Sequence, residues 1–251
     1  ITGAVILDAT TDNSFAANGS KPAIVLDGNL AGAGIHGLTI QAGNSTVRGL
    51  VINRFGGNGI QINGSNNLIA GNWIGLDATG TLKKGNGVDG ITISANNNTI
   101  GGTNTADRNV ISGNGDEGVD IDPGFTGNVI IGNYIGTNAS GMAGIGNGTS
   151  GNSGGILIDG SNTRVGGINP GEGNLIAYNN PYGIFLGTTP VGASILGNSI
   201  SSNGSLGIDL NANGVTANNG TKSSSLPNYD MDYPVITSAS LSSCNGLTVA
   251  R

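Results

Sequence analysis

The chain has few of the residues on which many protein functions depend. Its 251 residues include one cysteine, Cys244, and one histidine, His36. A single cysteine excludes an intrachain disulfide, and a single histidine excludes a metal site built from several imidazoles. Aromatic residues make up only 4% of the chain and charged residues 10%. The 48 glycines follow no G-X-Y period, which excludes collagen, and regularly spaced Ile, Val and Leu argue against disorder.

Basic charge and long apolar runs are also scarce. The formal net charge is −6, and without a basic face the chain is not expected to bind nucleic acid. No apolar run approaches the roughly 20 residues that span a bilayer, so membrane insertion is not expected. The chain starts within its repeat pattern at Ile1, without an initiator Met or a signal peptide, which predicts a fragment or a mature product.

Short apolar groups recur at strand spacing, most clearly over the stretch Arg108–Gly136. Alternation over a few residues, with turn residues between the groups, indicates short strands rather than helices. The apolar groups in this stretch are Val110–Ile111, Val119–Ile121, Val129–Ile131 and Ile135. The rest of the chain repeats this turn, which predicts an all-β solenoid with three strands in each coil.

A Gly-apolar-x-apolar unit marks the first strand of each coil. A second apolar group follows roughly ten residues later, and a third closes the turn. The units begin at Gly37, Gly59, Gly90, Gly118, Gly155, Gly183 and Gly207. One coil cannot bury its own aliphatic side chains, but coils stacked about 4.8 Å apart can. We therefore expect a parallel β-helix of six or seven coils.

Asparagine recurs at matching positions of successive coils. One set precedes the next first strand by four residues, and another precedes the third strand; they are Asn114, Asn179, Asn203 and Asn72, Asn133, Asn198. Stacked identical residues predict ladders of amide hydrogen bonds. Glycan attachment at Asn-x-Ser/Thr sequences, such as those at Asn44 and Asn97, is the alternative.

Insertions interrupt the repeat at two recurring corners. Those after strand three are Leu76–Asp89 and Thr137–Gly154, and those after strand two are Thr103–Arg108 and Ile168–Gly173. We expect each pair to leave the rod on one side, two coils apart. Loops on a rigid scaffold often carry binding sites.

The repeat pattern also predicts the domain organisation. Residues 1–211 are expected to form the β-helix, with irregular N-terminal coils, and residues 212–234 a linker or tail that packs on it. Residues 235–251 are expected to start a truncated β module or to form a C-terminal cap. The segment Leu226 to Ile236 is the part of the tail expected to lie on the helix.

These units resemble a known repeat family. The resemblance rests on the Gly-Ile-x-Ile units, on Asn67–Asn72 and Asn128–Asn133, on RNVISGN at Arg108–Asn114 and on IGTNASG at Ile135–Gly141. They resemble right-handed parallel β-helix repeats of the pectate-lyase-like fold, and most of all the Asn/Gly-rich kind in bacterial secreted and surface proteins. The resemblance covers about residues 1–211. It implies a secreted or cell-surface location, but the same fold carries lyases, hydrolases, epimerases and phage tailspikes, so it implies no single activity.

Carboxylates gather on the outward face of the first strands. Asp120 lies at one outward position, Asp122 and Asp159 lie at the next on adjacent coils, and Asp116 and Glu117 approach from the preceding corner. Carboxylates this close require a cation or a raised pKa. Three interpretations remain: a solvated patch, a Ca²⁺ site formed by all five carboxylates, or a polysaccharide-cleaving site that uses Asp120, Asp122 and Asp159. Apart from this possible Ca²⁺, the sequence predicts no requirement for a cofactor.

Four apolar or aromatic residues are candidate binding residues. Trp73 and Tyr134 occupy one position two coils apart, so exposed rings could stack on a glycan; burial under the insertions is the alternative. Leu157 and Phe185 are neighbours on an outward column, which predicts a partner surface that the tail could cover.

The sequence leaves three hypotheses for function. The first is a non-enzymatic secreted or cell-surface rod, a stalk or adhesin module that could bind a polysaccharide or a cell-surface glycan. The second is a polysaccharide lyase or glycoside hydrolase that uses the acidic face, although no polygalacturonase-like Asn-Thr-Asp or Gly-His-Gly sequence is present. The third is a self-associating filament, because open coil ends can pair with each other.

Overall fold

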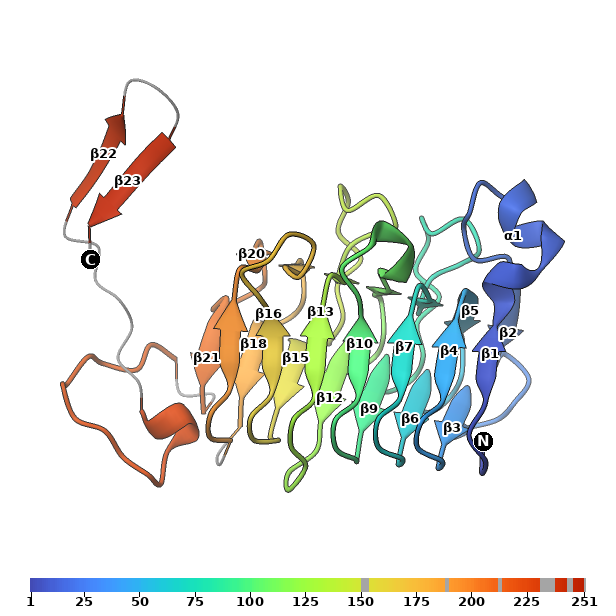
Figure 1. Ribbon diagram of the computed structural model, residues 1–251, viewed down its shortest axis with the longest axis horizontal. Coiled ribbons are helices and arrows are strands. Elements are labelled where there is room, and N and C mark those ends of the chain that lie inside the picture. Colours follow the sequence, from blue (N-terminus) through green and yellow to red (C-terminus); the bar gives the residue numbers. More distant parts are fainter. Residues whose placement is uncertain (150–153, 188–189, 212–213, 231–237, 243–245, 251) are drawn as a thin grey trace.

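The chain is an all-β solenoid whose coils stack along one axis (Figure 1). The computed structural model describes residues 1–149, 154–187, 190–211, 214–230, 238–242 and 246–250. Three parallel sheets of seven strands each form the body of the molecule. Each coil gives one strand to every sheet, so the predicted right-handed parallel β-helix of three strands per coil is confirmed.

The strands of each sheet follow the three apolar groups of the repeat. Sheet 1 consists of β3 (Leu38–Ile40), β6 (Ile60–Ile62), β9 (Ile91–Ile93), β12 (Val119–Ile121), β15 (Gly154–Ile158), β18 (Tyr182–Leu186) and β21 (Ile208–Leu210). Sheet 2 consists of β1 (Ile6–Asp8), β4 (Thr46–Arg48), β7 (Leu68–Ala70), β10 (Thr99–Gly101), β13 (Val129–Ile131), β16 (Arg164–Gly166) and β19 (Ser194–Leu196). Sheet 3 consists of β2 (Ile24–Asp27), β5 (Leu50–Asn53), β8 (Trp73–Ile74), β11 (Val110–Ile111), β14 (Tyr134–Ile135), β17 (Leu175–Ala177) and β20 (Ser199–Ser201).

The core is a set of aliphatic columns that run along the inside of the coil. Inward side chains such as Ile93, Ile121 and Ile158 pair in register on successive coils and have no exposed surface. β-Branched side chains suit this arrangement because they pack well on a pleated surface. The core therefore extends through the stack, and no single coil could form it.

Asparagine ladders line the corners, as the repeats predicted. Every ladder amide accepts a hydrogen bond from the backbone N–H of the preceding coil, so the corners are connected as well as the sheets. The two predicted ladders are longer than expected, since they also contain Asn109, Asn174, Asn86 and Asn147. A third, which the sequence analysis missed, contains Asn67, Asn98 and Asn128.

The N-terminal segment joins the same sheets. β1 pairs with β4 and β2 pairs with β5, both in parallel. Between β1 and β2 the chain forms the 3-10 helix η1 (Ala9–Thr11) and the helix α1 (Asn13–Ala17), which Asp12 caps by accepting a hydrogen bond from the N–H of Ser14 at 2.8 Å. The irregularity expected here is therefore the helical insertion, while the strands keep the register of the stack.

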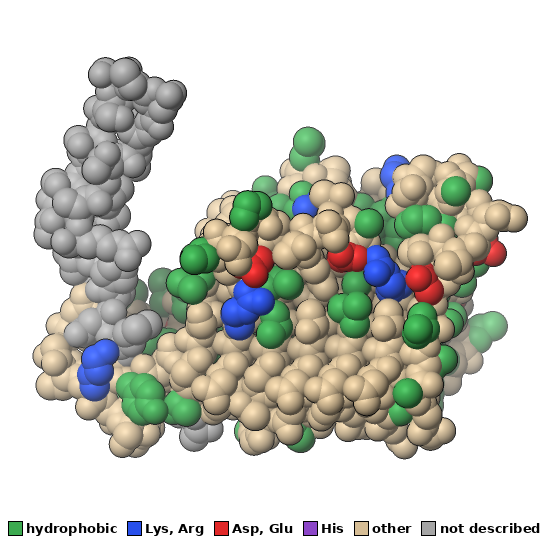
Figure 2. Space-filling view, viewed as in Figure 1, with side chains coloured by type: hydrophobic (Ala, Val, Ile, Leu, Met, Phe, Trp, Pro, Cys, Tyr) green, Lys and Arg blue, Asp and Glu red, His purple; other side chains and the backbone are tan. Residues whose placement is uncertain are grey.

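The insertions lie where the repeats placed them. β8 and β14, which precede one pair of insertions, are separated by β11 in sheet 3, and β10 and β16 are separated by β13 in sheet 2. One insertion contains the 3-10 helix η2 (Thr105–Asp107). Figure 2 shows one face of the molecule, on which a sparse row of charged side chains lies above a broad uncharged band. Outward arginines of sheet 2 form ion pairs with the insertions, Arg48 with Asp107 and Arg164 with Glu172.

The chain leaves the β-helix after β21. Near residue 228 it forms the 3-10 helix η3 (Pro227–Tyr229), and later β22 (Ser238–Ser242) pairs with β23 (Gly246–Ala250) in an antiparallel hairpin. The tail segment expected to lie on the helix is only partly described, because residues 231–237 lie outside the described residues. In the described part, Asn228 contacts the corner between β18 and β19, where its N–H donates to the Pro190 carbonyl at 2.7 Å.

Candidate functional site

The acidic face of sheet 1 has the register that the sequence predicted. Asp120 pairs with Thr92 on one side and with Leu157 on the other. The residues that follow the paired Ile121 and Ile158 are Asp122 and Asp159, which therefore lie on adjacent coils. The predicted proximity of these carboxylates is thus confirmed by the strand register.

The tightest carboxylate group differs from the predicted one. Single carboxylate oxygens of Asp89, Asp116 and Glu117 all lie within 4.8 Å of one another. Asp89 was not among the predicted residues, because it lies at the end of an insertion rather than in an outward column. It was detectable as the residue immediately before Gly90, which begins a first strand. Asp120, Asp122 and Asp159 lie on the same face but are not members of this group.

Asp89 and Glu117 form a buried carboxyl pair. Their residues are 4% and 7% exposed. Glu117 donates its backbone N–H to Asp89 Oδ1 at 3.1 Å, and a hydrogen bond also joins the two carboxyl groups. Burial, with the hydrogen bond to Asp89 and the charges of Asp89 and its neighbours, raises the pKa of Glu117 to about 10. The pKa of Asp89 is also raised, chiefly by burial. Glu117 is therefore protonated at neutral pH, and a hard cation could replace its proton.

Asp120 and Asp159 extend the acidic face beyond this pair. Burial, followed by the charges of the surrounding carboxylates, raises the pKa of Asp120 to about 8. One of its oxygens, Oδ1, is buried and accepts no hydrogen bond from the described residues. Burial and the charge of Asp122 raise the pKa of Asp159. Glu117 and Asp120 therefore both hold a proton at neutral pH.

Polar side chains connect the carboxylates along sheet 1. Asn58 donates to Thr92 at 2.6 Å, and the Thr92 hydroxyl donates to Asp89 Oδ2 at 2.7 Å. The Ser94 hydroxyl donates to Asp122 Oδ2. His36 accepts the backbone N–H of Asn58 through Nδ1 at 2.9 Å. These bonds fix the carboxylates of Asp89 and Asp122, which is more order than a solvated patch requires.

The predicted apolar pair of sheet 1 is confirmed in register but is not an open surface. Leu157 pairs with Phe185, and Phe185 is only 7% exposed. The Phe185 ring centroid lies 5.7 Å from that of Tyr182. Because this ring is covered, it offers a partner little area. The contact expected between this pair and the tail falls partly on residues outside the described part.

Trp73 and Tyr134 lie at one position two coils apart, as predicted, and a hairpin covers each of them. Both pair with Val110, which lies between them in sheet 3. Trp73 is 7% exposed and Tyr134 is half-buried. A Cβ added to Gly80 would lie 2.9 Å from the Trp73 ring, and one on Gly141 would lie 2.8 Å from the Tyr134 ring. Of the two sequence interpretations, burial under the insertions is therefore the correct one for Trp73.

The two covering insertions are copies of one hairpin. In the first, Asp77 Oδ1 accepts the N–H groups of Thr81 and Leu82; in the second, Asn138 Oδ1 accepts those of Met142 and Ala143. The hairpins also touch, because the N–H of Ala139 donates to the Gly80 carbonyl at 2.9 Å. The signal that could have revealed them is the shared Asp/Asn-Ala-Thr/Ser-Gly run.

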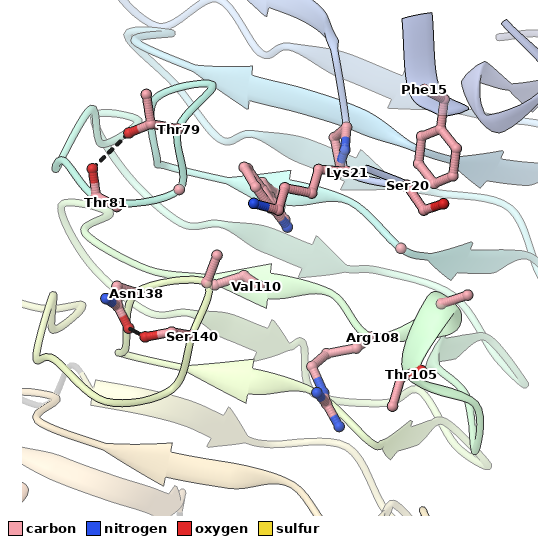
Figure 3. A pocket seen from close by; sticks show the side chains of 16 residues that line it. Phe15, Ser20, Lys21, Thr79, Thr81, Thr105, Arg108, Val110, Asn138 and Ser140 are labelled. Carbon is pink, nitrogen blue, oxygen red and sulfur yellow. Dashed lines mark hydrogen bonds between the residues drawn. The ribbon is translucent and has the colours of Figure 1, made fainter. Parts of the chain in front are cut away.

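These hairpins border a cavity of about 370 Å³. Figure 3 shows side chains from four separate segments around it, with Lys21 extending toward its middle and Arg108 at one rim. Its walls are an N-terminal segment, both hairpins, η2 and the part of sheet 3 beneath them. The lining residues are Phe15, Ser20, Lys21, Pro22, Gly71, Trp73, Thr79, Gly80, Thr81, Thr105, Ala106, Arg108, Val110, Asn138, Ala139 and Ser140. The two insertions after strand three therefore leave the rod on one side, as predicted, and the insertion that contains η2 meets them there.

Sequence reasoning did not find this cavity because four distant segments form it. Only Trp73 among its lining residues was a predicted binding residue. Comparison of the chain with protein-family models and with curated proteins found no match. No helix in the described part of the chain is long and apolar enough to cross a bilayer.

Proposed function

We propose that the chain is a non-enzymatic rod module of a secreted or cell-surface protein that binds a glycan on its insertion side. The observation that carries this proposal is the cavity under the hairpins, which combines aromatic, hydroxyl and amide side chains. Sugar rings have apolar faces and hydroxyl edges, so a site that offers aromatic carbon together with hydroxyl groups is complementary to them.

The scaffold supports the same proposal. The ladders and the continuous core keep the coils in register, while the hairpins are held by their own side-chain hydrogen bonds and by the bond between Ala139 and Gly80. A site whose walls are already fixed loses little conformational entropy when a ligand binds. A rigid rod with a preformed loop site is the arrangement expected of a stalk or adhesin module.

A panel of neutral and acidic oligosaccharides tests this function by calorimetry, with product analysis for released reducing ends and unsaturated uronates. Thr105 lines the cavity and is exposed, so Thr105→Trp should fill the cavity and weaken binding at least tenfold. Ile168, in the matching insertion, is 85% exposed and outside the lining, so Ile168→Trp should bind as the wild type does. Absence of binding to every oligosaccharide, or equal binding by Thr105→Trp, would overturn the proposal.

The carboxyl pair on sheet 1 supports a second candidate function, polysaccharide cleavage. A carboxyl group that holds its proton at neutral pH, such as that of Glu117, can serve as a general acid. Glu117 would act as the acid, and Asp122 as the base or nucleophile. Turnover in the same panel that disappears in Glu117→Gln, while binding at the cavity is retained, would favour this candidate over the first.

Self-association stays a prediction. The rod could join other copies through its coil ends, as the sequence suggested. Light scattering of the purified chain over a range of concentrations tests it directly, and a size that is independent of concentration would argue against a filament.

A further inference from the structure

The cavity is basic, although the chain as a whole is acidic. The chain carries a formal net charge of −6, with nine Lys and Arg residues against fifteen Asp and Glu. The 16 described residues that line the cavity include Lys21 and Arg108 and contain no carboxylate. A local excess of positive charge within an acidic protein marks a place where an anion is favoured.

Carboxylates adjacent in sequence to the lining are engaged elsewhere. Asp107, beside Arg108 in the chain, forms an ion pair with Arg48. Asp77 accepts the backbone N–H groups of its own hairpin, at 3.1 Å from Thr81 and 3.0 Å from Leu82. The charge of Asp107 is therefore offset by Arg48, and the carboxylate of Asp77 is held within its own hairpin.

Lys21 and Arg108 are both available to a ligand. The described part of the chain contains three salt bridges, and neither residue belongs to any of them. Lys21 is exposed and extends toward the middle of the cavity (Figure 3). A lysine in this position provides a compact charge with three N–H donors.

Arg108 is held in place by its neighbours. Its Nε donates to the Gly132 carbonyl at 3.3 Å, and its guanidinium lies 4.1 Å from the centroid of the Tyr134 ring. These contacts fix the plane of the guanidinium. They use one of its five N–H donors, and carboxylate and sulfate groups accept donors in this fork geometry.

The remaining lining distinguishes an acidic sugar from a small inorganic anion. Trp73, Phe15 and Val110 contribute apolar surface, and the hydroxyls of Thr79, Thr81 and Thr105 surround it. A volume of about 370 Å³ lies at the lower end of the range typical of small-ligand sites, about 300–1,000 Å³. A free phosphate or sulfate would leave the apolar part of the lining unused.

We propose that this cavity binds an acidic saccharide, one that bears a carboxylate or a sulfate group, with Lys21 and Arg108 as the residues that contact the charged group. This inference rests on the proposed glycan-binding function and adds the ligand class. The carboxylate and sulfate share the chemistry that the two cations recognise, so the test must distinguish them.

Binding of three oligosaccharides of equal length, one uronate, one sulfated and one neutral, tests the inference. The emission of Trp73, the only tryptophan, reports occupancy of the cavity, and calorimetry gives the affinity. We expect at least tenfold tighter binding of one acidic ligand than of the neutral one, with affinity that falls as salt rises. Inorganic sulfate alone should bind far more weakly, and equal binding of inorganic sulfate would contradict the saccharide assignment.

Charge variants locate the interaction. Lys21→Gln and Arg108→Gln should each weaken binding of the acidic ligand about tenfold or more and leave the neutral ligand unaffected. Lys222→Gln removes one positive charge from an exposed position outside the lining and should behave as the wild type. Lys21 is exposed, so its variant should keep the wild-type melting temperature even if Arg108→Gln does not.

The outcomes separate the two proposals. Equal binding of neutral and acidic ligands, or unchanged affinity in both charge variants, would overturn the acidic preference while glycan binding stands. If no oligosaccharide binds to the wild type, the proposed function itself fails. If Lys222→Gln weakens binding as much as Lys21→Gln does, the effect reflects overall charge and the assignment of Lys21 is wrong.

Discussion

Asn109 and Asn133 lie one coil apart, and Oδ1 of Asn133 accepts two hydrogen bonds from Asn109. The backbone N–H of Asn109 donates at 3.2 Å and its side-chain Nδ2 at 2.9 Å. Both residues have no exposed surface. One amide oxygen thus satisfies a buried backbone donor that the strands leave unpaired at the corner.

The first prediction concerns this ladder. Asn109→Ala removes the acceptor for the N–H of Asn72 and the donor to the Ile69 carbonyl, both buried. Each unsatisfied buried group costs about 1–3 kcal/mol, so we expect the free energy of unfolding in urea to fall by about 2–6 kcal/mol. Asn29→Ala, at an exposed position, should stay within about 0.5 kcal/mol of the wild type. Similar losses in both variants would show that the ladder carries no special stability.

The second prediction compares two glycines with the same backbone conformation. Gly80 and Gly19 both have φ of +69°, but a Cβ at Gly80 would lie 2.5 Å from the Cβ of Ala139, whereas one at Gly19 meets nothing within 4 Å. Gly19→Ala should therefore cost only the strain of a left-handed residue, roughly 1–2 kcal/mol. Gly80→Ala should destabilise more.

The emission of Trp73 separates these two effects. In Gly80→Ala the hairpin must move away from the ring, so the emission should shift to longer wavelength as water reaches the indole. Gly19→Ala should leave the emission maximum unchanged. An unshifted maximum in Gly80→Ala would mean that the hairpin adapts without uncovering Trp73.

The third prediction is a dependence of stability on pH. The folded chain holds a proton on Asp120 up to a pKa of about 8, whereas the unfolded chain releases it near the ordinary value of 3.8. Between these two pH values the folded state binds more protons than the unfolded state. The contribution of Asp120 to the free energy of unfolding is therefore complete below about pH 4 and is lost as pH rises through about 8. The fall is at most about 1.4 kcal/mol per pH unit for this one group.

Thermal melts of the wild type and Asp120→Asn over this pH range provide the measurement. The wild type should lose stability as pH rises, and Asp120→Asn should lose less because its amide carries no charge. Repeating the melts with Ca²⁺ and with a chelator shows whether the acidic face holds protons or binds a cation. If Ca²⁺ abolishes the decline, the acidic face binds the cation; if stability rises with pH, the raised pKa of Asp120 is wrong.

The fourth prediction concerns the tail. Asn228 Oδ1 accepts the N–H of Ala193 at 2.9 Å, and its Nδ2 donates to the Ala193 carbonyl at 3.0 Å. The amide thus continues the line of backbone hydrogen bonds beyond the last strand of sheet 2. Asn228→Ala should speed hydrogen exchange at the Ala193 amide by tenfold or more, because this donor loses its acceptor.

Ser225→Ala is the matched control in the same tail. The Ser225 hydroxyl is exposed and interacts with Ser223 of the tail itself, so its loss should leave exchange at Ala193 unchanged. Equal exchange at Ala193 in the wild type and in Asn228→Ala would mean that the tail does not protect this corner.

The sequence determined the architecture of this protein. The spacing of units such as Gly118–Ile121 and Gly155–Ile158 determined which residues face inward, because strand period and coil length together leave one register that buries the Ile and Val side chains of these units. The ladders followed from the same periodicity. So did the paired insertions and the shared face of Asp120, Asp122 and Asp159, since residues at equal positions in a repeat must stack.

The tertiary structure decided what lies outside the periodicity. Trp73 is buried because the second hairpin also reaches it through Ala139. The basic cavity required α1, both hairpins and η2 to meet. The geometry of non-repeating loops depends on contacts between segments far apart in the chain, whereas the strand register depends only on the spacing of residues along it.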